Sequence, residues 1–282
     1  MRLFLIITIT MIAFAANSVL ARLALGPGEI DAAAYSLVRL LSGAIMLSIL
    51  AIPGRELRLS QLLQQGSWIS ALALFGYAAA FSFAYLLLET GTGALILFPS
   101  VQAAMVAWAL YRGDRPGPLE WLGLVTATGA IVWLLSPGLT APDPLGALLM
   151  IVAGVSWAIY TLRGTGSADP LKSTTGNFIR SVPIALVLML FYIGSAHATP
   201  FGIAMATISG AVTSAMGYAL WYYVLKQITA TQAAVTQLSA PVIAAIMGLA
   251  LTGDTLTLRF VAASAFILGG VAIAILGRSR RT

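Results

Sequence analysis

The chain has 282 residues, of which 60% are hydrophobic and only 9% are charged, far below the roughly 25% of charged residues in an ordinary soluble domain. It contains no cysteine and one histidine, His197, which excludes disulfides, thiolate metal sites and histidine clusters, so we expect neither a metal nor another cofactor. The formal net charge is +6, but the 15 basic residues are scattered between apolar runs, which argues against a nucleic-acid partner.

Apolar runs of about 20 residues, the length that a helix needs to cross a bilayer, recur along the chain. Turn formers such as Gly26-Pro27-Gly28 and Asp169-Pro170 separate them. Backbone polar groups in lipid must bond within their own segment, so the sequence predicts an all-α integral membrane protein with ten transmembrane helices. The predicted spans are 3–25, 31–52, 67–88, 92–111, 118–136, 144–163, 174–194, 200–223, 230–251 and 258–277.

The first two spans each carry an unusual feature. The first begins after Arg2 and contains Val19-Leu20-Ala21, as a cleavable signal peptide would, but we favour a retained helix because a similar segment recurs in the second half of the chain. In the second span, Arg39 lies about 12 Å along the helix from its entry point. An arginine at that depth either attracts a substrate carboxylate, or bonds to helix-end carbonyls or extends to the membrane interface; both readings remain open for Arg39, and for Arg180, in the seventh span, we favour the second.

Aromatic side chains line one face of the third span, where residues 77, 81 and 85 are spaced by one helical turn, and one face of the eighth. Flat amphipathic rings suit a cavity for an aromatic or heterocyclic solute, although a lipid-facing aromatic belt is the alternative. The aromatic cavity candidates, with one neighbouring serine, are Tyr77, Phe81, Ser82, Tyr85, Trp157, Tyr160, Tyr218, Trp221 and Tyr222.

Prolines and uncharged polar residues within the spans complete the cavity candidates. Pro99 and Pro241 are predicted to lie in mid-helix, where each would free a backbone carbonyl that can act as a hinge or a ligand. Asn17, Gln102 and Gln237 could bond either to a substrate or to a neighbouring helix.

The distribution of basic residues predicts the orientation of the chain. With the N-terminus inside, Arg259 is the one basic residue of the outer loops, whereas eleven fall on the cytoplasmic side. Both termini are therefore predicted to be cytoplasmic, in a multi-pass protein of a bacterial inner membrane. The cytoplasmic residues are Arg2, Arg55, Arg58, Arg112, Arg115, Arg163, Lys172, Lys226, Arg278, Arg280 and Arg281.

The two halves of the chain carry similar motifs in the same order, at an offset of 140 to 143 residues. The first half comprises residues 1–138 and the second residues 139–282, with five predicted spans each. An odd number of spans makes the second copy enter the membrane from the opposite side, so we expect inverted repeats around a central cavity. The matched pairs are Phe14-Ala15-Ala16-Asn17 with Trp157-Ala158-Ile159-Tyr160, Val38-Arg39 with Ile179-Arg180, Gly76-Tyr77-Ala78 with Gly217-Tyr218-Ala219, Pro99 with Pro241, Gly113-Asp114 with Gly253-Asp254, and Gly129 with Gly269.

These motifs resemble the drug/metabolite transporter superfamily, specifically its EamA-type branch of ten-helix carriers. Within that branch the chain looks most similar to the YddG-type aromatic amino acid exporters. Asp114 and Asp254 depart from the glutamate that the family commonly has after the glycine of each last loop. The resemblance implies a cavity lined by spans one to four and six to nine, with the fifth and tenth spans at the periphery.

All nine carboxylates lie in loops or at span ends, so a proton relay through a buried carboxylate has no candidate. We expect an inner-membrane transporter that exports small organic solutes, aromatic or other amino acids, by alternating access, working as a monomer in the lipid bilayer. An exporter of drugs or nucleobase-like metabolites and a channel-like facilitator remain alternatives. An intramembrane enzyme would need a nucleophile with a base or a metal cluster, and the sequence supplies neither.

Overall fold

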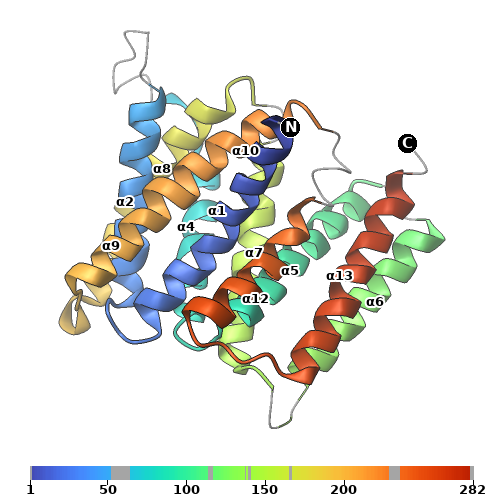
Figure 1. The fold of residues 1–282 in the computed structure, drawn as a ribbon. Helices are drawn as coiled ribbons and strands as arrows, with labels where there is room; N and C mark the ends of the chain where they lie inside the picture. Colours follow the sequence, from blue (N-terminus) through green and yellow to red (C-terminus); the bar gives the residue numbers. More distant parts are fainter. Residues whose placement is uncertain are drawn as a thin grey trace.

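The computed structural model describes residues 2–51, 64–113, 117–136, 138, 141–164, 167–228 and 236–279 (Figure 1). Within these residues the chain is helical and has no β-strand; the one backbone bridge joins Ile30 to Ala198. Several predicted loop residues fall outside the described part, namely Arg55, Arg58, Asp114, Arg115, Arg280 and Arg281.

Eight helices of the described part are long and apolar enough to cross a membrane. Two shorter apolar helices, α4 (Trp68–Ala84) and α12 (Ser239–Leu251), lie where the third and ninth spans were predicted. The eighth predicted span is one continuous rod of α9 (Pro200–Ile208), a π-helix η2 (Ser209–Met216) and α10 (Gly217–Leu225). The other long helices are α1 (Arg2–Leu25), α2 (Ala32–Ala51), α5 (Thr90–Tyr111), α6 (Pro118–Leu135), α7 (Pro144–Gly164), α8 (Pro170–Phe191) and α13 (Leu258–Ser279).

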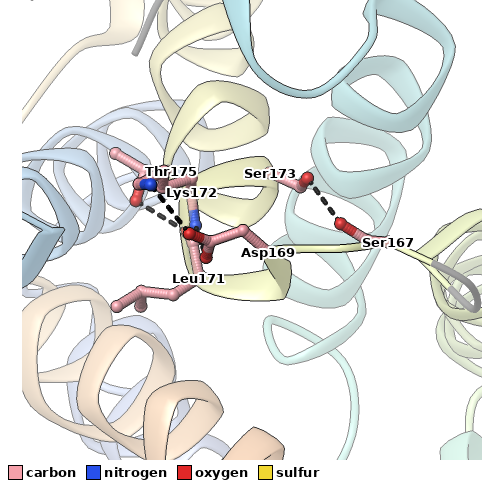
Figure 2. A network of polar contacts seen from close by, with 6 residues as sticks. All are labelled: Ser167, Asp169, Leu171, Lys172, Ser173 and Thr175. Carbon is pink, nitrogen blue, oxygen red and sulfur yellow. Dashed lines mark hydrogen bonds and ion pairs between the residues drawn. The ribbon is translucent and has the colours of Figure 1, made fainter. Parts of the chain in front are cut away.

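Local chemistry moves the start of α8 from the predicted residue 174 to Pro170 (Figure 2). Asp169 caps the helix, since its Oδ1 accepts a hydrogen bond from the Lys172 backbone N–H at 3.1 Å, and its Oδ2 pairs with Lys172 Nζ at 3.0 Å. Partial burial raises the pKa of Asp169, but the bonds to Lys172 and its charge outweigh burial and bring the pKa below the usual 3.8. Proline at the first position needs no N–H partner there, so the helix begins immediately after its cap.

The structure corrects the predicted position of Pro241. Residue 241 lies in the first turn of α12, which begins at Ser239, and not in mid-helix. Residues 236 and 237 are also helical and Leu238 keeps helical backbone angles, so the proline lies just after a break in a helical segment; the Gln237 carbonyl is the group that an N–H at position 241 would bond. Pro99, in contrast, lies inside α5 as predicted.

Helices α6 and α13 form an antiparallel pair at the edge of the bundle (Figure 1). Glycines allow close contact: a Cβ added to Gly123 would lie 2.3 Å from the Gly270 carbonyl oxygen. At the other end of the pair, Arg259 donates to the carbonyls of Trp133 and Ser136, so the start of α13 lies beside the end of α6. Small residues at such contacts let two helix backbones approach within membranes.

Of the remaining helices, α1, α2, α4, α5, α7, α8 and the α9–η2–α10 rod share one large core, whereas α12 contributes to smaller clusters beside it. Helix α1 packs against α12 and the α9–η2–α10 rod, while α7 packs against α5 and α4; α2 contacts α8 and η2. The first turn of α1, the start of α6 and the last turns of α13 all lie at the upper end of the bundle in Figure 1, and the connection from α12 to α13 lies at the lower end.

Candidate functional site

A small, partly open cavity lies at the centre of the bundle; its free space of about 440 Å³ includes space that is open to solvent. Its wall is mainly aromatic and aliphatic, with a few polar groups, which is the usual make-up of a small-molecule site. The lining residues come from α1, α4, α5, α7 and α10 and from the segment before α12, and they are Phe14, Asn17, Ser18, Tyr77, Phe81, Leu97, Phe98, Val101, Trp157, Tyr218 and Gln237.

Three aromatic rings from both halves of the chain meet in this wall. The Trp157 ring lies between Tyr77, with centroids 4.9 Å apart, and Tyr218, with centroids 5.0 Å apart. Phe81 continues the row along α4, 5.5 Å from Tyr77. Tyr77 and Phe81 therefore share a face that lines the cavity, as the one-turn spacing predicted, whereas Tyr85 follows the last residue of α4 and does not line it. Six of the fifteen predicted cavity residues line it: Asn17, Tyr77, Phe81, Trp157, Tyr218 and Gln237.

Arg39 lies one layer behind this wall and is only 2% exposed. Its Nη2 donates to Tyr77 Oη at 3.0 Å and to Ser214 Oγ at 3.3 Å. The guanidinium carbon lies 4.8 Å from the centroid of the Phe81 ring and 5.0 Å from that of Tyr77, a cation–π arrangement. Arg39 thus touches two cavity residues without lining the cavity itself.

The π-helix η2 connects Arg39 to α1. Asn17 Oδ1 accepts hydrogen bonds from Ser209 Oγ at 2.8 Å and from Thr213 Oγ1 at 2.6 Å, and Ser214 Oγ lies 3.3 Å away. A π-helical turn widens the backbone by one residue, and such turns are common at functional sites. Here the turn presents three hydroxyl groups toward one amide.

The other predicted residues lie outside the cavity wall. Ser82 and Tyr85 are fully buried: Ser82 Oγ accepts from Ser36 at 2.9 Å, and Tyr85 Oη donates to the Thr90 carbonyl at 3.3 Å. Tyr160 and Tyr222 both bond to Thr174, at 3.2 and 3.1 Å. The remaining four are Pro99, Gln102, Trp221 and Pro241, none of which lines the cavity.

Five lining residues were not among the predicted ones. The sequence indicated Phe14 only indirectly, because it belongs to a motif that recurs in the second half of the chain. In the structure it packs against Tyr218, with ring centroids 6.0 Å apart. Ser18 lies one turn after Phe14. Leu97, Phe98 and Val101 carry no signal, since apolar side chains on α5 look the same whether they face lipid or a cavity.

The two other arginines predicted within spans bind backbone carbonyls. Arg22 donates to the Tyr85 carbonyl at 3.2 Å. Arg180 donates to the carbonyls of Gln65 and of Gly176, the latter at 3.2 Å, as favoured for it from the sequence. Among the described residues, no group of three His, Asp or Glu side chains is placed to hold a metal ion.

In the described residues, a bundle of apolar helices around a central cavity is the architecture of a multi-pass membrane protein that can hold a small molecule. Known proteins give the family. Residues 144–276 match the EamA-like transporter family. An uncharacterized Pseudomonas aeruginosa protein, PA1977, is 44% identical over 99% of this chain and 98% of its own length.

Other relatives are more distant. The uncharacterized inner membrane transporter YedA of Escherichia coli is 25% identical over 66% of this chain and 62% of its own length. The threonine/homoserine exporter RhtA of Salmonella typhimurium is 28% identical over 54% of this chain and 52% of its own length. A solved crystal structure with 20% sequence identity has the same fold, with a TM-score of 0.66 over 98% of this chain and 99% of that one.

The chain belongs to the EamA-like transporter family, within the drug/metabolite transporter superfamily. Membership implies a transporter in a lipid bilayer that acts on a small molecule, rather than an enzyme, and the bacterial relatives agree with an inner-membrane location.

Proposed function

We propose that the chain is a ten-span exporter of small organic solutes, with amino acids as the leading substrates and aromatic ones first, and that it works by alternating access between two inverted five-span repeats. The observation that carries the proposal is the central cavity, whose row of rings combines Tyr77 of the first half with Trp157 and Tyr218 of the second. A site formed by both halves opens to one side or the other when the halves move relative to each other.

The helix contacts support the inverted repeat. Suppose that each predicted span is exchanged for its counterpart in the other half, so that α1 becomes α7, α12 becomes α5 and the α9–η2–α10 rod becomes α4. The contacts of α1 with α12 and with the rod then correspond to the contacts of α7 with α5 and with α4, which are also present. The same exchange maps the pairs α2 with α8, α5 with α12 and α6 with α13 onto themselves. These relations are those expected of a two-fold axis in the membrane plane. The antiparallel course of α6 and α13 also agrees with an inverted second copy.

The substrate class rests on the cavity wall and on one relative. Stacked rings with few polar groups suit an aromatic side chain, as in the YddG-type exporters that the sequence resembles. The relative RhtA is named for the export of threonine and homoserine, which favours amino acids more broadly. Drugs and nucleobase-like metabolites are the second candidates, since rings also stack on planar heterocycles.

Orientation and assembly complete the proposal: both termini in the cytoplasm, a monomer as the working unit, and no nucleic-acid partner. Substrate moves down its own gradient or in exchange, because the one carboxylate within the described helices that could cross the bilayer, Glu120, lies in the first turn of α6 and not in mid-membrane.

Counterflow in proteoliposomes tests this function. Vesicles preloaded with one amino acid should accumulate the same radiolabelled amino acid, with saturation and with acceleration by substrate on the far side. A panel of aromatic, hydroxylated and aliphatic amino acids, nucleobases and a cationic dye identifies the class. Flux that does not saturate and shows no acceleration by substrate on the far side would indicate a channel-like facilitator, and absence of flux for the whole panel would refute the proposal. An imposed pH gradient should leave the rate unchanged; strict dependence on it would overturn the uncoupled mechanism.

A further inference from the structure

The buried side of the cavity carries a positive charge with no negative partner nearby. Arg39 is 2% exposed, and the ion pair found among the described residues, Lys172 with Asp169, lies at the start of α8. A charge buried at the depth of Arg39 is costly unless a partner compensates it. Hydroxyl groups and rings lower this cost but leave the charge unneutralised.

The contacts of the guanidinium are all with neutral groups. Tyr77 and Ser214 accept from Nη2, and Nε also donates weakly to Ser214 Oγ at 3.4 Å. Nη1 is buried and has no hydrogen-bond partner among the described residues. An unsatisfied N–H on a buried cation is expensive, so the protein's own groups do not fully compensate the charge of Arg39.

The polar groups between Arg39 and the cavity are hydrogen-bond donors. Tyr77 Oη accepts from Arg39, which leaves its own hydrogen available, and Tyr77 lines the cavity. Asn17 Oδ1 is occupied by the hydroxyls of η2, which leaves its amide N–H groups for the cavity that Asn17 also lines. Two donors backed by a cation form a site for an anion, because hydrogen bonds to a charged acceptor are about twice as strong as neutral ones.

We propose that Arg39, Tyr77 and Asn17 form an anion subsite that binds the carboxylate of the transported solute, while the ring cluster around Trp157 holds its apolar part. Tyr77 and Asn17 touch the carboxylate. Arg39 is a positioning residue that polarises the Tyr77 hydroxyl and supplies the compensating charge. This inference rests on the proposed function and deepens it: the substrates are carboxylates, including zwitterionic amino acids, and not amines or neutral heterocycles.

The test is ligand binding, measured by thermal stabilisation of the purified protein in detergent and independent of flux. The probes are L-phenylalanine, 3-phenylpropionate and L-phenylalaninamide, which share a phenyl ring but differ in the carboxylate. The wild type should bind the two carboxylates at least tenfold more tightly than the amide. Arg39→Gln and Tyr77→Phe should each weaken carboxylate binding about tenfold and change amide binding less than twofold. Arg39→Lys should restore part of the loss.

Arg22→Gln is the matched control, because Arg22 binds a backbone carbonyl away from the cavity wall and should leave all three affinities unchanged. Equal binding of carboxylates and amide by the wild type, or equal weakening of both by Arg39→Gln and Tyr77→Phe, would overturn the subsite. If Arg39→Gln does not fold, Tyr77→Phe decides alone. Carboxylate-selective binding without counterflow would leave the subsite standing and refute the transport function, so the two failures are distinguishable.

Discussion

Trp157 is the residue through which the two halves of the chain meet in the cavity wall. It contacts Tyr77 and Tyr218, the same position of the two proposed repeats, at nearly equal ring distances of 4.9 and 5.0 Å. Both tyrosines are at most 6% exposed, whereas Tyr111, near a span end, is 82% exposed. The exposed fraction of the side chain therefore distinguishes aromatic residues of the cavity from those of a lipid-facing belt, a choice that the sequence left open.

Truncating either tyrosine should therefore weaken transport. Tyr77→Ala and Tyr218→Ala each remove an aromatic contact worth about 0.5–1.5 kcal/mol, so flux at low substrate concentration should fall about two- to tenfold. Counterflow measures the effect, and Tyr111→Ala is the control that should transport normally. Wild-type flux in both cavity variants would refute the assignment of the cavity.

At the start of α8, acid should abolish the contribution of Asp169 to the stability of the folded protein. The pKa of this carboxyl is lowered in the folded protein, so its stabilising effect is present above the usual value near 3.8 and is lost as the pH falls through the lowered pKa. The ion pair with Lys172 is half-exposed and worth less than about 1 kcal/mol. Asp169→Asn, which retains a capping oxygen, should melt slightly below the wild type at pH 7, and the difference should shrink as the pH falls below 3.8 and through the lowered pKa. A difference that does not shrink as the pH is lowered in this way would contradict this account.

At the scale of the elements, the close approach of α2 to η2 holds Arg39 in place. A Cβ added to Gly210 would lie 2.0 Å from the Arg39 carbonyl oxygen and 2.1 Å from Ser42 Oγ. Only glycine allows the π-helix to approach α2 so closely that Ser214 reaches the guanidinium. The contact depends on backbone and cannot adapt by rotating a side chain.

Gly210→Ala should therefore destabilise the protein by about 1–3 kcal/mol, the usual cost of overpacking. Gly129→Ala is the control, since nothing lies within 4 Å of a Cβ at that position and alanine favours a helix. Thermal melting in detergent compares the two. An unchanged melting temperature for Gly210→Ala would mean that α2 and η2 are not packed as described.

A second comparison uses two adjacent glycines of α13, one of which faces α6. A Cβ at Gly270 would lie 2.7 Å from the Ala127 backbone nitrogen, whereas nothing lies within 4 Å of one at Gly269. Gly270→Val should separate the two helices and lower the melting temperature, while Gly269→Val should change it little. Equal effects of the two substitutions would argue against this interface.

At the scale of the whole molecule, the positions of the helix ends test the proposed inverted topology. Because α6 and α13 run antiparallel, the start of α6 and the start of α13 lie at opposite ends of the pair. The connections that lead into them should then be exposed on opposite faces of the membrane.

Labelling of single cysteines tests this arrangement, since the chain has no cysteine of its own. In intact spheroplasts, a membrane-impermeant maleimide should label Leu256→Cys at once and Arg112→Cys only after permeabilisation. Ser195→Cys, on the exposed turn between α8 and α9, is the control for the outer face. Labelling of residues 112 and 256 from the same side would refute the inverted repeats and the mechanism built on them.

The sequence alone determined that the chain is an all-helical membrane protein, where its apolar segments lie, and that Tyr77 and Phe81 share a face, because hydropathy and one-turn spacing are local properties. Only the tertiary structure decided which polar groups meet. The contact of Asn17 with η2 joins residues 192 to 197 positions apart, and a π-helical turn has no local signature that would have predicted it. Pro241 was misplaced because apolarity continues on both sides of the start of α12, so hydropathy gives no boundary there.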